Sequence, residues 1–154
     1  MNEAVNWANA AAEIEQLALE ELKMYRQLEG LMARQREAVD REDTEQLMKV
    51  VGVKQSVLER IGAIQKAVGP VKTSWADHAG QFEPEVRQRI ETTFRQTGES
   101  IKAILEIEDE TRRRLESRRD GMMGQIRNID RGRQASKAYG YAAAPPEGTI
   151  ERKG

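Results

Sequence analysis

Few side chains in this 154-residue chain could carry out acid–base or nucleophilic catalysis. His78 is the single histidine and cysteine is absent, so a histidine-based pair or triad has only one candidate. No glycine-rich loop of the kind that cradles phosphate groups occurs. His78 follows Asp77 in a segment that also holds Gly69, Pro70 and Gly80, and we interpret it as a solvated loop histidine. The sequence therefore predicts no catalytic residue and no cofactor, and we expect the chain not to be an enzyme.

Two adjoining charge-rich runs, Glu106–Glu110 and Arg112–Arg114, could suggest a carboxylate metal site or a nucleic-acid contact. Consecutive helix positions point in different directions and no Glu-x-x-His pattern accompanies them, so no metal site is predicted. Residues 106–131 hold seven basic and seven acidic groups, which leaves no net field for phosphates. The runs form favourable i,i+4 pairs: Glu108 with Arg112, Asp109 with Arg113, and Glu110 with Arg114. We interpret them as helix-stabilising pairs and expect no nucleic-acid partner.

Composition points to long, exposed helices. Charged residues make up 33% of the chain, hydrophobic residues 38% and aromatic residues 5%, while the net charge is only −1. Balanced charge with sparse, regularly spaced aliphatic residues is typical of helices and argues against an α/β enzyme with a deep core. No run approaches 18 apolar residues, so we expect no membrane insertion. The start of the chain lacks the basic region of a signal peptide, and the absence of cysteine fits a reducing cytoplasm.

Apolar residues recur at helical spacing in three segments, which predicts helices over about 9–40, 43–68 and 84–130. Asp43 followed by Gln46 resembles a capping box, Gly69–Pro70 should stop the second helix, and Pro84 suits the start of the third. The short connection at residues 40–43 predicts an antiparallel hairpin. The predicted fold is all-α: an antiparallel three-helix coiled-coil bundle over residues 1–131 with a long third helix. Residues 132–154 are expected to form a flexible, disordered C-terminal tail.

The predicted third helix is longer than its neighbours can cover. At ~1.5 Å per residue it spans roughly 70 Å, so on the order of 25 Å projects beyond the turn at residues 40–43. An apolar stripe without a partner in its own chain must be buried by something else. The projecting part carries Leu115, Met122, Met123, Ile126 and Ile129. These residues are the candidate surface for association with another protein or with a second copy of the chain.

Two tyrosines lie in the predicted tail. Tyr139 and Tyr141 are aromatic residues in a polar segment that has no core of its own. Transient packing on the bundle and a short recognition motif both explain them. Residues 1–48 carry eleven acidic and five basic residues, whereas residues from 131 onward carry five basic and two acidic ones. The tail is therefore suited to contact the first helix or an acidic partner.

The first hairpin also resembles a known family over residues 19–68. Its motif residues are Leu19-Glu20-Glu21-Leu22, Tyr25, Leu28 and Leu31, then Arg36-Glu37-Ala38-Val39, Asp43, Leu47, Lys54-Gln55 and Leu58. This order of helix, acidic turn and second helix is similar to that of the FlgN-type flagellar export chaperones. The tail tyrosine and the terminal Glu151-Arg152-Lys153-Gly154 also fit that family, as do chain length and helix order.

The resemblance implies a cytoplasmic chaperone without ATPase activity. Such chaperones bind the C-terminal helical region of hook-associated proteins of the hook–filament junction, prevent premature assembly and deliver them to the export gate. Carried over to this sequence, the cargo surface is the stripe from Met122 to Ile129, and Tyr139 is the candidate for docking at the cytoplasmic domain of the gate. Tyr141 and the pair Pro145-Pro146 depart from the family pattern, so either tyrosine could correspond.

Two other functions remain open at this point. A self-associating structural coiled-coil protein without cargo would bury the overhang in a homodimer. A nucleic-acid binder would use the arginine run and show steeply salt-dependent affinity.

Overall fold

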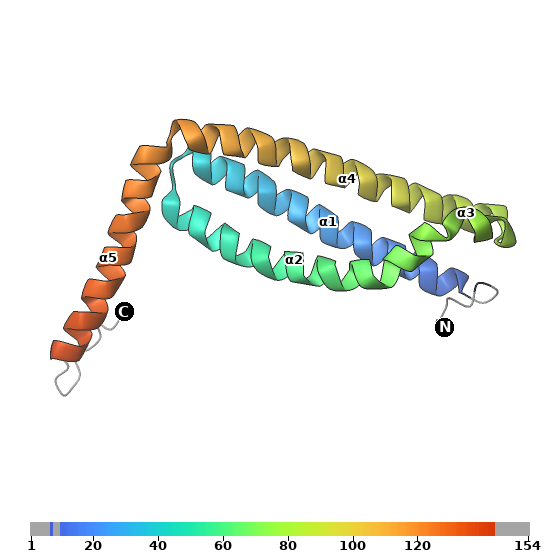
Figure 1. Ribbon diagram of the computed structural model, residues 1–154, viewed down its shortest axis with the longest axis horizontal. Coiled ribbons are helices and arrows are strands. Elements are labelled where there is room, and N and C mark those ends of the chain that lie inside the picture. Colours follow the sequence, from blue (N-terminus) through green and yellow to red (C-terminus); the bar gives the residue numbers. More distant parts are fainter. Residues whose placement is uncertain (1–6, 8–9, 144–154) are drawn as a thin grey trace.

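The computed structural model describes the backbone of Trp7 and of residues 10–143, and the side chains of Trp7 and of residues 10–134. This part of the chain forms α1 (Ala11–Asp40), α2 (Thr44–Thr73), the short α3 (Trp75–His78), a 3-10 helix (Ala79–Gln81), α4 (Pro84–Ser117) and α5 (Arg119–Ala143), with no strand among the described residues (Figure 1). The prediction of an all-α chain is confirmed.

α1 lies between the other two long helices. α2 returns antiparallel to α1 after the turn at residues 41–43, and α4 runs in the same direction as α1 on its other side (Figure 1). Both α2 and α4 pack extensively on α1, but within the described residues they barely touch each other. The narrower prediction of an antiparallel three-helix coiled-coil bundle is not confirmed, because α2 and α4 each pack along α1 without packing along each other.

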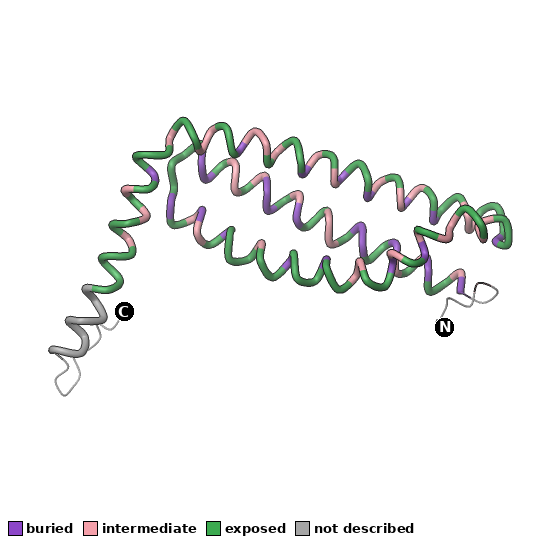
Figure 2. Tube along the Cα trace, in the orientation of Figure 1, coloured by how far each residue is buried: buried purple, intermediate pink, exposed green. Residues whose placement is uncertain are grey.

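The buried positions follow this arrangement, with one regular series along α1 (Figure 2). The central hydrophobic cluster joins α1 and α2 with one α4 residue and consists of Leu28, Leu31, Met32, Val50, Val57, Ile61 and Ile104. On the α4 side, most of the buried residues are small and polar: Thr93, Thr97, Ser100 and Thr111. Small side chains allow close approach of two helices, but they bury little apolar surface.

α2 continues past the predicted stop. It includes Pro70 and ends at Thr73, although the sequence predicted an end near Val68. Proline in a helix interior removes one backbone hydrogen bond, and tertiary packing can outweigh that loss. Val68 and Val71 on either side of Pro70 are fully buried, so packing keeps the segment helical. The predicted loop over residues 69–83 is therefore mostly helical, and α2 gains Lys72.

That extension completes a buried polar network between α1 and α2. Glu21 is fully buried, and its carboxylate accepts hydrogen bonds from Lys72 Nζ and Gln65 Nε2, each at 2.9 Å. Gln65 also donates to the Tyr25 hydroxyl at 2.8 Å. Burial, together with the charge of Glu21, raises the pKa of Tyr25. A buried carboxylate is costly unless it is paired and hydrogen-bonded, and Lys72 and Gln65 together supply these contacts to Glu21.

The predicted third helix is two helices. α4 ends at Ser117, and α5 leaves the bundle in a different direction after Arg118 (Figure 1). The Arg118 side chain turns back toward Asp40 and Glu42, at 3.7 Å from each carboxylate. A continuous helix over 84–130 was therefore wrong. The helical backbone of α5 also reaches Ala143, inside the segment predicted to be a disordered tail from residue 132; residues 144–154 lie outside the described part.

The turn between α1 and α2 contains one residue in an unfavourable conformation. Asp43 caps α2 by accepting a hydrogen bond from the Gln46 backbone N–H at 3.1 Å, as predicted. Glu42, directly before it, has φ of 52°, in the left-handed region that favours glycine.

Replacing Glu42 tests this strain. Glu42→Gly should raise the free energy of unfolding by about 1 kcal/mol relative to Glu42→Ala, because both variants lack the carboxylate and only alanine keeps a Cβ. Urea denaturation of the two variants measures the difference. Equal stability of the two would show that the turn is not strained.

Candidate partner-binding surface

The residues considered for catalysis are engaged in packing. His78 lies at the end of α3, where its ring stacks on Trp7 with centroids 4.2 Å apart, and its Nδ1 is 3.0 Å from the Ser74 carbonyl oxygen. Trp75, Phe82 and Phe94 complete this aromatic cluster. His78 is thus a packing residue and not the solvated loop residue predicted. Across the described residues, no group of three or more His, Asp or Glu side chains could hold a metal ion.

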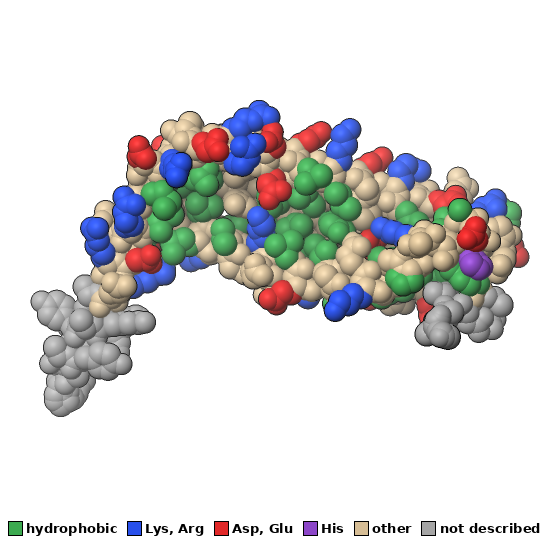
Figure 3. Space-filling model, viewed as in Figure 1, with side chains coloured by type: hydrophobic (Ala, Val, Ile, Leu, Met, Phe, Trp, Pro, Cys, Tyr) green, Lys and Arg blue, Asp and Glu red, His purple; other side chains and the backbone are tan. Residues whose placement is uncertain are grey.

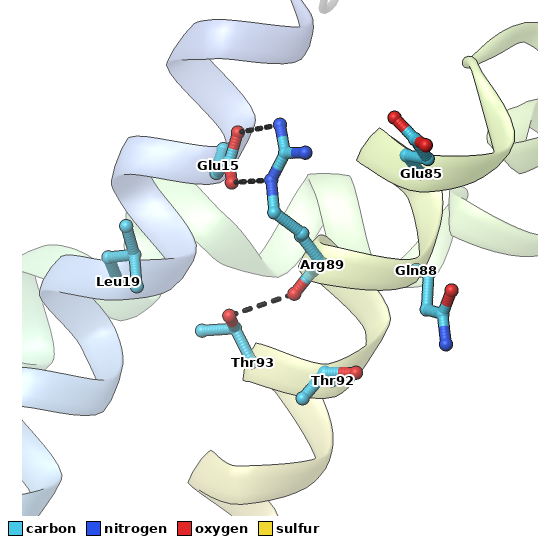
Figure 4. Close-up of a pocket in the computed structure, with 7 residues that line it drawn as sticks. All are labelled: Glu15, Leu19, Glu85, Gln88, Arg89, Thr92 and Thr93. Atoms are coloured by element: carbon cyan, nitrogen blue, oxygen red, sulfur yellow. Dashed lines mark hydrogen bonds and ion pairs between the residues drawn. The ribbon is translucent and has the colours of Figure 1, made fainter.

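A shallow depression between α1 and α4 is occupied by an ion pair. Figure 4 shows the Glu15 carboxylate facing the Arg89 guanidinium, with contacts of 2.7 and 3.2 Å. The hydrogen bond from Arg89 lowers the pKa of Glu15. Thr93 donates to the Arg89 carbonyl oxygen, and Leu19 lies exposed beside the pair. The paired charges tie α1 to α4.

The arginine run on α4 is also paired. Asp109 contacts both Arg112 and Arg113, and these hydrogen bonds lower the pKa of Asp109. Glu110 accepts from Arg36 of α1 at 2.8 Å and from Arg114 at 2.9 Å, and the Arg36 bond is the main reason that the pKa of Glu110 is lowered. Two of the three predicted i,i+4 pairs are present; Arg112 bonds to Asp109 and Glu116 instead of Glu108. These pairs stiffen α4 and fasten it to α1.

An open groove runs between α2 and α4, with α1 as its floor. It has a volume of about 460 Å³, and its lining comes from all three helices: Met32, Gln35, Lys54, Leu105, Glu108, Asp109, Thr111, Arg112 and Leu115. The groove exists because α2 and α4 do not pack on each other. In the space-filling view, hydrophobic side chains gather along the strip between these two helices (Figure 3).

Large apolar residues lie in or beside the groove walls and are exposed to solvent. Leu105 of α4 is 58% exposed. Val51 and Leu58 lie three residues before and four residues after Lys54, so they share its face of α2, and they are 48% and 39% exposed. Contiguous exposed apolar residues of this kind mark interaction sites. The groove is the strongest candidate for a partner-binding surface in the part of the chain that the structure describes.

The stripe predicted from the overhang divides into three kinds of position. Leu115 lines the groove, and Met123, on the first turns of α5, is 43% exposed. Ile126 and Ile129 are half-buried. Met122 is fully buried among Ala38, Val39 and Leu47 at the α1–α2 turn. Met122 therefore anchors α5 and is not available at the surface, because the break at Arg118 turns it into the end of the bundle.

The apolar surface of the groove continues to α5. Hydrophobic side chains also gather in the angle between α5 and the bundle (Figure 3). Besides Met122, the Thr44 hydroxyl, which donates to Gln125 Oε1 at 3.3 Å, fastens α5 to the start of α2. The groove and the first turns of α5 thus form one continuous apolar surface, which bends where α5 leaves the bundle.

Sequence reasoning missed Val51, Leu58 and Leu105 as surface residues. Val51 and Leu58 recur at helical spacing with the other apolar residues of the second predicted helix, and this spacing alone does not separate them from core positions. One signal was available: Val50, Val51, Val53, Val57 and Leu58 surround α2 on more than one face, which is more apolar surface than a single neighbour can cover.

Tyr139 and Tyr141 lie within the helical backbone of α5. Their side chains fall outside the part that is described, so their proposed docking role stays a prediction. None of the described helices is long and apolar enough to cross a membrane.

Comparison with protein-family models identifies a family that matches most of the chain. The model of the family described as flagellar protein FliT matches residues 22–141, from the middle of α1 to near the end of α5. Comparison with curated proteins and with solved structures finds no match.

Two adjacent methionines test how α5 is held. Met122→Ala should weaken the attachment of α5 by about 2 kcal/mol or more, because it empties a buried site. Hydrogen exchange should then show lost amide protection in residues 119–130, with α1 and α2 unchanged. Met123→Ala, which changes an exposed neighbour, is the matched control. If both variants keep wild-type protection, Met122 is not the anchor.

Proposed function

This chain belongs to the FliT family of flagellar export chaperones, and we propose that its cargo is a hook-associated protein of the hook–filament junction. The chaperone binds the C-terminal helical region of that protein in the cytoplasm, prevents its premature assembly and delivers it to the export gate. The family match supports the chaperone role, while the FlgN-type resemblance of the first hairpin supports this choice of cargo.

The groove between α2 and α4 is the observation that carries the proposal. An amphipathic helix binds by laying its apolar face into a hydrophobic groove, with anchors at i, i+3, i+4 and i+7. Here the walls already consist of helices that present Leu58 and Leu105, and Met32 lies on the floor. A bound helix would pack on α2 and α4 together and would complete the bundle that these helices leave open.

The start of α5 extends this surface. Leu115, Met123, Ile126 and Ile129 are the cargo contacts that we propose there, and buried Met122 supports them from beneath. Methionine suits such a surface, because its flexible, polarizable side chain adapts to partners of different shape. Covering the apolar face of the cargo would keep that face from pairing with other cargo molecules, which is how binding would prevent assembly.

Docking at the export gate is assigned to the end of the chain. Tyr139 is our candidate for contact with the cytoplasmic domain of the gate, with Tyr141 as the second candidate. Because α5 points away from the bundle (Figure 1), contacts at its far end would leave the groove free for cargo.

Charge placed in the groove should prevent cargo binding. Leu105→Glu and Leu58→Glu should each weaken binding about tenfold or more, because cargo would bury an unpaired carboxylate. Binding of the hook-associated proteins from the same genome can be measured by calorimetry. Val53→Glu is the control: Val53 is 50% exposed on the same helix, about 160° around the axis from Val51.

Equal binding by all three variants would contradict the groove as the cargo site. Sedimentation of the same proteins measures their oligomeric state and distinguishes a cargo chaperone from a self-associating protein. A tight dimer that forms without cargo and is broken by Leu105→Glu would favour a self-associating coiled-coil protein.

Substitution of the two tyrosines near the end of α5 should weaken binding to the gate and leave cargo binding unchanged. Tyr139→Ala should weaken binding of the chaperone–cargo complex to the cytoplasmic gate domain by about tenfold, the usual range for an aromatic interface residue. Cargo affinity should not change. Tyr141→Ala, two residues away, is the comparison variant, and wild-type gate binding by both would remove the docking role from this segment.

A further inference from the structure

Polar groups without partners converge in the groove between α2 and α4. Thr111 is only 4% exposed, and within the described part of the chain its hydroxyl has no hydrogen-bond partner. The buried Gln35 Oε1 also lacks one there. Both residues line the groove. Buried polar groups are nearly always hydrogen-bonded, so two unpaired groups in the lining of one groove mark a place where a ligand could supply the missing partners. Both atoms are closed to solvent in the structure, so each side chain would turn toward the groove when the ligand binds.

Lys54 adds an unpaired charge to the same site. It is half-buried on the α2 wall, and no carboxylate of the described residues lies within 4 Å of its ammonium group. The other groove cation, Arg112, is paired with Asp109 and Glu116. Glu108 lies at the exposed rim and forms no ion pair with Lys54 in the structure. Lys54 is therefore a cation without a counter-ion in the described part of the chain; it lines the groove with Leu105 and shares a face of α2 with Val51 and Leu58.

The chemistry of these groups selects the ligand. A lysine ammonium can only donate hydrogen bonds, and the Thr111 hydroxyl has a proton to donate. Gln35 can present its NH₂ group in place of Oε1 by turning its amide over. An anionic acceptor satisfies all three groups, and a carboxylate has enough lone pairs to do so.

We propose that the groove recognises a carboxylate on the cargo helix. An Asp or Glu, flanked at helical spacing by apolar residues, enters between Lys54 and Thr111 while its neighbours pack on Leu58 and Leu105. This inference rests on the proposed function, since it assumes that the groove holds a cargo helix. It also explains selectivity: an apolar helix without the carboxylate would bury Lys54 unpaired, and that penalty rejects it.

Charge variants of the full-length chain test the proposal. Lys54→Met keeps the apolar stem and should weaken binding of the cognate hook-associated protein about tenfold, and Lys54→Glu should weaken it further. Thr111→Val, which removes only the hydroxyl, should have a smaller effect in the same direction. Lys49→Glu is the matched control, because Lys49 is exposed on the same helix about 140° around the axis from Lys54.

A charge swap identifies the partner residue. Each Asp and Glu in the C-terminal helical region of the cargo is changed to Lys and tested against Lys54→Glu. One of these changes should restore affinity to near the wild-type value, and the same change should weaken binding to the unaltered chaperone. Wild-type binding of Lys54→Met and Lys54→Glu, alongside lost binding of Leu105→Glu, would overturn the carboxylate site and leave the groove as the cargo site. Failure of every hook-associated protein to bind the unaltered chain would overturn the proposed function and this inference together.

Discussion

The architecture depends on α1, which carries two helix–helix interfaces at once. α2 packs on one side of it and α4 on the other, and these two outer helices barely touch each other in the described residues. Three helices around a common axis would each pack along two neighbours, whereas here α2 and α4 each pack along α1 only, apart from the contact of α5 with the start of α2. The remaining apolar faces border the groove, so the binding surface is a direct result of the way the helices are arranged.

The side chains at the two interfaces differ in kind, and this difference sets where the apolar residues go. α4 meets α1 largely through Thr93, Thr97 and Ser100, which bring the helices close without large apolar side chains. Leu105 and Leu115 of the same helix line the groove instead. Only 38% of the residues are hydrophobic, and some of the few large aliphatic side chains lie at the surface that a partner would cover. Ion pairs such as Arg36–Glu110 and Arg89–Glu15 then help to hold α4 on α1.

Local sequence signals predicted most of the helix boundaries, and the boundaries that differ are set by tertiary contacts. The cap at Asp43, the start at Pro84 and the turn at residues 40–43 depend on short-range chemistry, so the sequence was sufficient for them. At two positions the local signal was misleading. α2 continues through Pro70, where Val71 is buried, and the helix breaks at Arg118, after which Met122 is buried. The overhang argument predicted uncovered apolar residues over 115–129; Met123 is exposed there, whereas Met122 is buried. The groove could not be predicted, because the spacing of apolar residues does not show whether α2 and α4 pack on each other.

The buried Glu21 has a consequence for how the first two helices find each other. Its carboxylate is neutralised by Lys72 from the last turn of α2 and bonded by Gln65, two turns earlier. Aliphatic contacts between α1 and α2 would tolerate sliding by one helical turn, about 5.4 Å. Such a slip would carry Glu21 away from Lys72 and leave a bare charge inside the protein. The network therefore selects one alignment of the hairpin, and with it the one position of Lys54 opposite Thr111 across the groove.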